Sequence, residues 1–274
     1  MRLAFSTLAC PEWSLERAAD AAVRYRYEGI ELRVLDGELL SPEIDRTARS
    51  RVRRVLGDAG LALCCVDTSF EIANPDEDLD EALAFVDLAA DLGAPAIRLF
   101  GGAPGGEERA RTASRVATRL GTLSERGRDR GVGIAVENHD TFARGDVLAE
   151  VLAAAPTDVG VVWDPLNALV AGESVERTYA AVHERVVHVH IKDGGVPPDL
   201  ERNVLVGDGR VPIAGVVSIL AADGYDGWLS VEWEKRWQPS IPDAGVALPR
   251  YADALRAILR DIERAGMETG PSGR

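Results

Sequence analysis

The chain is poor in cysteine and in long apolar runs, and each shortage excludes a class of protein. Three cysteines, Cys10, Cys64 and Cys65, occur among 274 residues. Their number is odd, and their spacing is neither that of a disulfide framework nor that of a zinc motif. We therefore expect buried, reduced thiols in a cytoplasmic protein. No stretch reaches the roughly 18 apolar residues that a membrane span requires, so the sequence predicts no membrane partner.

Positive charge and histidine are also scarce. The 45 acidic residues outnumber the 31 Lys and Arg residues, which gives a formal net charge of −14, and histidine occurs only four times. A negative average field repels a polyanion such as DNA, although a local basic groove is compatible with it. We therefore expect no nucleic-acid partner, while the sequence leaves open whether the chain forms a homo-oligomer.

What the chain has in abundance is a regular alternation of strand and helix patterns. Short runs rich in Val, Ile and Leu predict eight strands, at 3–7, 29–33, 61–68, 96–101, 132–139, 159–164, 186–193 and 227–234. Helical patterns follow them at 14–27, 42–58, 77–92, 107–129, 144–154, 174–184, 212–223 and 246–265. Eight strand–helix pairs indicate an α/β fold, the (β/α)8 TIM barrel.

The alternation continues without an interior linker. We therefore predict a single TIM-barrel domain over residues 1–266. The final segment, METGPSGR at 267–274, has the composition of a disordered tail. The glycine-rich stretch 194–209 is long for a barrel connection, and we expect either a lid over the site or a simple excursion of the chain.

Four late strands end in acidic or imidazole side chains that have the same phase. These residues are Glu137, Asp164, His190 and Glu232. Because residues two apart in a strand share a face, each falls on the small or polar face, opposite an apolar face that suits the helix layer. All four then point into the barrel at the end where TIM-barrel enzymes place their active sites. Three carboxylates and one imidazole suit one divalent ion, such as Mn²⁺, Mg²⁺, Co²⁺ or Zn²⁺.

For any single carboxylate at a strand end, a solvated surface acid or a helix cap is the simpler interpretation. Four in phase on consecutive strands are harder to explain in that way, because unpaired charges inside a barrel mouth would repel one another and would be costly to desolvate. A divalent cation removes both problems. The sequence therefore predicts a metal centre.

Other polar side chains near the strand ends are candidates for substrate contact. Lys192, one layer above His190, suits a substrate oxygen or phosphate, or else a structural ion pair with Glu234 or Asp193. His188, one layer below His190, suits either substrate contact or a hydrogen-bonded place in the core. Asn138 follows Glu137 directly and suits either a ligand-orienting role or a role within its own loop.

Three further side chains alternate inward on early strands, namely Glu31, Arg33 and Arg98. For these we slightly favour an internal salt-bridge network over direct substrate contact, and Arg98 is kept as a substrate-binding candidate. Trp13 lies in a loop near a strand end, where an aromatic ring could wall a sugar pocket or pack in the core.

Over nearly its whole length the sequence resembles the xylose isomerase-like TIM-barrel superfamily, in its sugar phosphate isomerase/epimerase branch. The resemblance rests on the ordered Glu, Asp, His and Glu of strands five to eight, and on seven motifs. These are GIELR, RLFGG, VENHD, VVWDPLN, VHVHIKD, VGDGRV and LSVEWEK.

The resemblance implies that Glu137, Asp164, His190 and Glu232 hold one divalent ion. It further implies that the two glutamates form the catalytic acid/base pair, while the aspartate and the histidine are ligands only. Asn167 stands where the abasic-site endonuclease branch and several epimerases carry histidine, so it is the candidate substrate contact at that position. The strands that end at Thr68 and Gly101 also lack the histidines that further zinc sites would need.

The function implied is that of a metal-dependent isomerase or epimerase in carbohydrate metabolism, acting on a small polyhydroxy ketone such as a keto-sugar or sugar phosphate. One glutamate would remove a proton next to a polarised carbonyl, giving an enediolate, and the other would return it. The alternatives are a metal-dependent dehydratase of an inosose or a dehydroshikimate-type ketone, and a non-catalytic sugar-binding barrel. The intact glutamate pair argues against the last of these.

Overall fold

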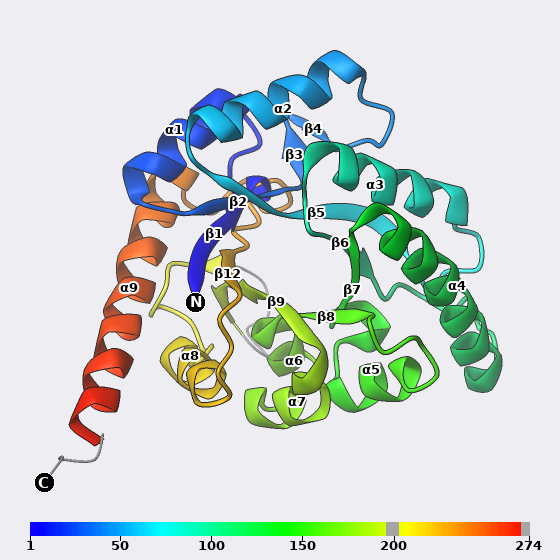
Figure 1. Cartoon of the computed structure of the whole chain (residues 1–274). Helices are drawn as coiled ribbons and strands as arrows, with labels where there is room; N and C mark the ends of the chain where they lie inside the picture. Colours follow the sequence, from blue (N-terminus) through cyan, green and yellow to red (C-terminus); the bar gives the residue numbers. More distant parts are fainter. Residues whose placement is uncertain (196–202, 270–274) are drawn as a thin grey trace, which may run out of the picture.

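The eight predicted strands all form, and they pair side by side into a closed parallel barrel (Figure 1). The computed structural model describes residues 1–195 and 203–269. Around the barrel the order is β1-β12-β9-β8-β7-β6-β5-β2. The strands are β1 (Arg2–Ser6), β2 (Gly29–Leu32), β5 (Ala62–Glu71), β6 (Ala96–Phe100), β7 (Gly133–Glu137), β8 (Gly160–Trp163), β9 (Val186–Ile191) and β12 (Trp228–Val231). The predicted TIM barrel is confirmed.

The predicted helices form an outer ring around the barrel (Figure 1). They are α1 (Leu15–Tyr25), α2 (Arg46–Asp58), α3 (Leu79–Leu92), α4 (Arg109–Arg130), α5 (Gly145–Leu152), α7 (Val175–Val182), α8 (Ile213–Ala222) and α9 (Ala244–Thr269). Local chemistry sets several of their ends. The hydroxyls of Ser14 and Ser174 cap the first turns of α1 and α7, and Gly131 ends α4 with φ 70°, a left-handed conformation that glycine adopts without strain.

Several short elements were not predicted, and most of them follow directly on a barrel strand. They are η1 (Thr7–Ala9), the hairpin of β3 (Val34–Leu35) and β4 (Glu38–Leu39), η2 (Asp140–Phe142), α6 (Pro165–Val170), η3 (His183–Arg185), and β10 (Asp193–Gly194) with β11 (Asn203–Val204). All of them except η3 belong to loops at the carboxyl ends of the strands. These loops surround the end of the barrel where the predicted site lies.

Two sequence predictions reach beyond the described residues. The tail was expected to begin at residue 267, but α9 continues to Thr269, and 270–274 lie outside the described part of the chain. The stretch 194–209 contains 196–202, which the structure does not describe either, so its role as a lid stays a prediction. Within the described residues, no helix combines the length and the apolar character that crossing a membrane would require.

The two faces of each strand separate as the alternation predicts. In β9 and β12, Val189 and Val231 join the large hydrophobic core together with apolar residues of the helices. Their neighbours His190 and Ser230 pair in register and are fully buried on the opposite, interior face. A second, small apolar cluster of Ala4, Cys64 and Trp228 lies lower in the barrel, near the starts of the strands. The polar layers therefore lie above an apolar floor.

Candidate metal centre

The four predicted strand-end residues meet in the barrel mouth. One ligand atom from each of Glu137, Asp164, His190 and Glu232 lies within 4.8 Å of the others. We call these four residues the quartet. Glu137 ends β7, His190 lies in β9, and the other two directly follow β8 and β12. The quartet is buried, with Glu232 the most exposed at 4%. Parallel strands that end at one level of a closed barrel bring the four side chains together, as their shared phase indicated.

Each of two quartet carboxylates keeps one oxygen that is buried without a hydrogen bond and that has only an ion-pair contact, with Arg98 or with Lys192. These oxygens are Oε2 of Glu137 and Oδ2 of Asp164. The other oxygen of Asp164 accepts from the backbone N–H of Leu166 at 2.8 Å and of Asn167 at 3.1 Å, and so caps α6. Buried polar atoms in proteins are normally satisfied. A donor set of three carboxylates and an imidazole, with buried oxygens lacking hydrogen bonds, fits a divalent cation.

The imidazole of His190 is aimed at two of the carboxylates. Its Nδ1 lies 3.2 Å from Oε1 of Glu137 and 3.4 Å from Oε2 of Glu232. Burial alone would lower the pKa of His190, but the charges of Glu232, Glu31 and Glu137 outweigh burial and hold this pKa well above its ordinary value. The same attraction keeps the glutamates ionised. Although burial raises the pKa of Glu232, His190 and Lys192 bring it well below the usual range.

Lys192 lies against the quartet as a fixed positive charge. Its Nζ is 2.7 Å from Oε2 of Glu232, 2.9 Å from Oδ2 of Asp164 and 2.6 Å from Oε1 of Glu234. Burial would lower the pKa of Lys192, but these carboxylates hold it well above its ordinary value. The ion pair with Glu234 that the sequence left open is present. A contact between Lys192 and substrate stays a prediction.

Arg98 gives the site a second buried cation, as the predicted internal network requires. Its guanidinium lies 3.4 Å from Oε2 of Glu137, 3.5 Å from Oδ2 of Asp67 and 3.9 Å from Oε1 of Glu232. It also donates to the carbonyl oxygen of Thr68 at 3.1 Å. With these contacts, Arg98 links Asp67 on β5, Glu137 on β7 and Glu232 directly after β12. Its role as a substrate contact is untested.

A second polar layer lies beneath the quartet, and sequence reasoning found only part of it. Glu31 on β2 has Oε2 at 2.5 Å from Nε2 of His188 and Oε1 at 3.2 Å from Nε2 of His190. Asp67 on β5 is fully buried and was not recognised as a site residue. Burial and the charge of Glu31 raise the pKa of Asp67 well above its ordinary value. His188 thus has the hydrogen-bonded place in the core that was one of its two options.

The two candidate asparagines form hydrogen bonds to other residues of the site. Asn138 donates to the carbonyl oxygen of Asp164 at 2.8 Å and accepts from its N–H at 2.6 Å, which ties the end of β7 to the end of β8. Asn167 donates from Nδ2 to Oε1 of Glu137 at 3.2 Å. Asn167 therefore contacts a quartet residue directly. Substrate contact by either residue stays a prediction.

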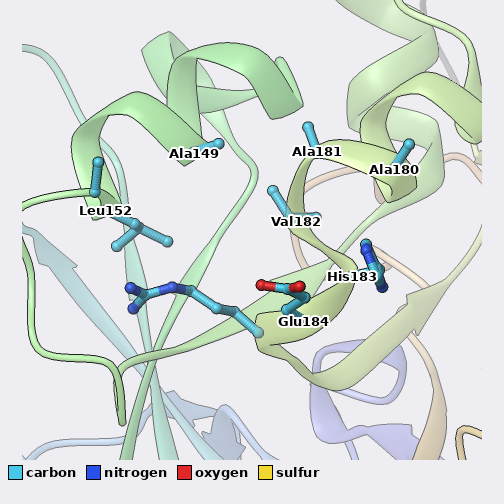
Figure 2. A pocket seen from close by; sticks show the side chains of 9 residues that line it. Ala149, Leu152, Ala180, Ala181, Val182, His183 and Glu184 are labelled. Carbon is cyan, nitrogen blue, oxygen red and sulfur yellow. The ribbon is translucent and has the colours of Figure 1, made fainter.

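Two other features lie apart from the quartet. Trp13 packs against the hydrophobic core, and the guanidinium carbon of Arg17 lies 4.5 Å from its ring centroid. Core packing was one of its two options, and substrate contact by Trp13 stays a prediction. A surface hollow of about 320 Å³ lies between α5 and α7, on the outer face of the barrel (Figure 2). It is lined by Ala149, Leu152, Ala153, Ala180, Ala181, Val182, His183, Glu184 and Arg185. This hollow contains none of the quartet.

Comparison with known proteins places the fold in a defined group. Residues 19–262 match the family model described as xylose isomerase-like TIM barrel. An inosose dehydratase of Lacticaseibacillus casei is 25% identical over 165 residues, which cover 53% of this chain and 55% of that protein. The chain thus spans about half the length of this curated relative.

Solved structures show the same fold at low sequence identity. The structure of an L-ribulose 3-epimerase has a TM-score of 0.79 and 16% identity, covering 100% of this chain and 99% of that one. A probable 3-DHS dehydratase from Bacillus anthracis has a TM-score of 0.74 and 14% identity, covering 93% and 99%. At these identities the likeness establishes the architecture alone.

Proposed function

The chain belongs to the xylose isomerase-like TIM barrel family, and on that premise we propose that it is a divalent-metal-dependent isomerase or epimerase of a small polyhydroxy ketone, free or phosphorylated. One observation carries the proposal. The glutamates Glu137 and Glu232 converge with Asp164 and His190 on a single buried point. Relatives of this fold include an epimerase and dehydratases by name.

The quartet would hold one ion of Mn²⁺, Mg²⁺, Co²⁺ or Zn²⁺. Such an ion supplies a Lewis acid that polarises a substrate carbonyl and so acidifies the neighbouring carbon. Asp164 is prepared as a ligand, because its Oδ1 is fixed by the cap on α6 and its backbone by Asn138. His190 is prepared as a ligand because Nδ1 faces the glutamates while Nε2 faces Glu31.

The two glutamates are suited to proton transfer. They are carried by β7 and β12, which are separated around the barrel by β8 and β9, so they approach a bound substrate from different directions. Burial raises the pKa of each, but in the metal-free chain neighbouring positive charges, above all His190, hold both below the ordinary glutamate value. A bound divalent ion would supply this positive charge when His190 is a neutral ligand. Each is therefore a carboxylate at neutral pH and able to accept a proton. Return by the other glutamate, on the opposite face or at the adjacent carbon, gives epimerisation or isomerisation.

A dehydratase is the second candidate, and the placement of Lys192 favours it. Its ammonium group lies 2.7 Å from Oε2 of Glu232, next to the proposed base. If the substrate carries a hydroxyl at the β-carbon, a glutamate removes the α-proton, the C–O bond breaks, and Lys192 protonates the departing hydroxide to water. The inosose dehydratase relative is consistent with this chemistry over the half of its length that matches.

The proposal is tested by hydrogen exchange in D₂O. The protein, loaded in turn with each of the four ions, is incubated with ketoses, ketose phosphates, inososes and 3-dehydroshikimate. We expect solvent deuterium at the carbon next to the carbonyl for one substrate class, with loss of one water only if the enzyme is a dehydratase. Protein stripped of metal and the His190→Ala variant should show no exchange, while the surface control Glu184→Gln should match wild type. Isomerisation or epimerisation that occurs without any solvent deuterium at carbon and without loss of water would indicate a hydride shift and refute proton transfer by the glutamates.

A further inference from the structure

Arg33 is a buried guanidinium fixed at the barrel mouth. It follows β2 directly and has the phase of Glu31, two residues earlier, so it lies on the interior side one layer closer to the mouth. Only 4% of the residue is exposed. Its backbone is held on both sides, because its N–H donates to Oγ1 of Thr7 at 3.0 Å and its carbonyl oxygen accepts from the N–H of Leu40 at 3.0 Å. The side chain therefore starts from a rigid position.

The charge of Arg33 has no carboxylate partner among the residues that the structure describes. Nη2 donates to the hydroxyl of Ser69 at 2.9 Å, but Nη1 is buried and makes no hydrogen bond. Arg98 and Lys192, the other two buried cations of the site, each lie within 4.0 Å of three carboxylates. Burying an unpaired charge is costly, and buried charges in proteins are normally paired.

The guanidinium of Arg33 is nevertheless close to the quartet. Burial and then the charge of Arg98 lower the pKa of Arg33 to about 10, against the opposing attraction of Asp67, Glu232 and Glu137. These charged side chains line the barrel mouth. The side chain of Arg33 therefore lies on the same interior face of the barrel as the quartet. At neutral pH it remains charged.

The group that pairs with the charge of Arg33 and accepts from Nη1 must therefore come from outside the described residues. A neutral hydroxyl would satisfy the free N–H of Nη1 but would leave the buried charge unpaired. A carboxylate or a phosphate satisfies both, because its oxygens match the planar fork of the guanidinium.

We propose that Arg33 is an anion-binding subsite of the barrel mouth, and that the substrate is a small polyhydroxy compound bearing a carboxylate or a phosphate. The identification of that compound as a ketone rests on the function proposed above. The subsite itself rests on the burial, the fixed backbone and the unpaired guanidinium of Arg33. Ser69 orients the guanidinium through Nη2 and leaves Nη1 for the ligand.

Matched pairs of non-reacting probes test the subsite without turnover. Shikimate and its methyl ester differ by one carboxylate charge, and D-glucitol 6-phosphate and D-glucitol differ by one phosphate. Calorimetric titration of the Mg²⁺-loaded protein should show tighter binding of at least one charged member. In Arg33→Gln that affinity should fall about 10- to 100-fold, the scale of a charge-assisted hydrogen bond, and the neutral members should be unaffected.

Variants separate charge from geometry. Arg33→Lys keeps the charge and loses the fork, so it should retain part of the preference for the anion. Ser69→Ala should weaken the same charged probe less than Arg33→Gln does. Arg54→Gln removes one positive charge from the exposed face of α2, where Arg54 lies 3.8 Å from Asp58, and should leave all four affinities unchanged. An equal loss in Arg54→Gln would attribute the effect to net charge and overturn the subsite.

The outcomes distinguish the subsite from the proposed reaction. Charge-selective binding that depends on Arg33 supports the subsite even if no exchange in D₂O is ever found. Equal binding of charged and neutral members by wild type, or no binding of either charged probe, overturns the subsite and leaves the metal centre and proton transfer intact. Preference for shikimate identifies the anion as a carboxylate, and preference for the glucitol phosphate identifies it as a phosphate.

Discussion

At the scale of single residues, the two carboxylate oxygens of Asp164 make contacts with different parts of the structure. Oδ1 caps α6 through the N–H groups of Leu166 and Asn167, and Oδ2 faces the quartet and Lys192. Helix and site are thus linked through one carboxylate. A neutral amide at this position can keep the cap while it loses the charge, which allows the two functions to be separated by mutation.

We predict that Asp164→Asn binds a divalent ion much more weakly than wild type and keeps the cap of α6, while it loses the buried ion pair with Lys192. Asp164→Ala should lose ion binding and also the cap, which is worth about 0.5–2 kcal/mol. Calorimetric titration with Mn²⁺ and urea unfolding of the metal-free proteins measure the two effects. Ser174→Ala, which removes the cap of α7 away from the site, should lose about 1 kcal/mol with unchanged ion affinity. A normal ion affinity in both Asp164 variants would remove Asp164 from the ligand set.

The glutamate pair gives a second prediction at this scale. Glu137→Gln and Glu232→Gln each keep an oxygen ligand and lose the base, so we expect turnover to fall about 10²–10⁴-fold, the usual range for general acid–base groups. Ion affinity should fall less than turnover does. Once a substrate is known, rates and titrations of both variants measure the two effects. Turnover that falls only in proportion to ion binding would mean that the glutamates act as ligands only.

Strand alternation was enough to predict the quartet, because four residues with one phase at four strand ends must meet in a closed barrel. It was not enough for the layer beneath. Asp67 and Glu31 lie on β5 and β2, across the barrel interior from His190, and no periodicity in the sequence reports which strands face each other at a given depth. The partners of Lys192 were likewise only partly predicted, since Asp164 was assigned to the metal, Glu232 to the metal and to proton transfer, and neither to an ion pair with Lys192.

At the scale of secondary-structure elements, Arg51 joins three segments at the barrel's rim. From α2 it contacts Glu16 on α1 at 2.5 Å and Asp36, between β3 and β4, at 2.5 Å. Asp36 also accepts the N–H of Leu15 at 3.0 Å, at the start of α1. The β3–β4 hairpin that follows Arg33 is therefore fastened to two helices. Its strands of two residues each are too short to give a sequence pattern, which is why the hairpin was not predicted.

The cluster of Arg51, Glu16 and Asp36 predicts a specific dependence of the free energy of unfolding on pH. The hydrogen bond from Arg51 lowers the pKa of Glu16 to about 2, from 4.5 for the free side chain. A depressed carboxyl pKa contributes stability that is fully present above pH 4.5 and is lost as the pH falls through about 2. Because the pair is partly exposed, we expect no more than about 1 kcal/mol from it.

Arg51→Gln should therefore lower the free energy of unfolding by up to about 1 kcal/mol at neutral pH, with a difference that shrinks between pH 4.5 and 2. Urea unfolding at a series of pH values measures it. Arg54→Gln, three residues further along α2, is the control and should follow wild type throughout. A difference that is constant with pH would show that Arg51 stabilises the chain by packing alone.

At the scale of the whole molecule, the net charge and the composition of the site together predict that the protein does not cleave damaged DNA. The formal net charge is −14. Asn167 stands where the resemblance implies a histidine in the abasic-site endonuclease branch, and His190 is the only imidazole of the quartet. We expect no incision of an abasic duplex in the presence of Zn²⁺, even at low salt, where electrostatic binding to DNA is strongest. Robust metal-dependent incision by wild type, absent in His190→Ala, would overturn the proposed substrate class.

The pairing of β1 with both β2 and β12 has a consequence for how the chain is made. β1 is synthesised first and β12 last among the barrel strands, so the nascent chain carries an open sheet edge until residues 228–231 leave the ribosome. Glu232 emerges directly behind that strand. At typical translation rates, roughly 10–40 s separate β2 from this moment. The last strand to be synthesised thus closes the barrel and brings in the last residue of the quartet, so the proposed metal centre cannot form in a nascent chain before its strand edges are protected.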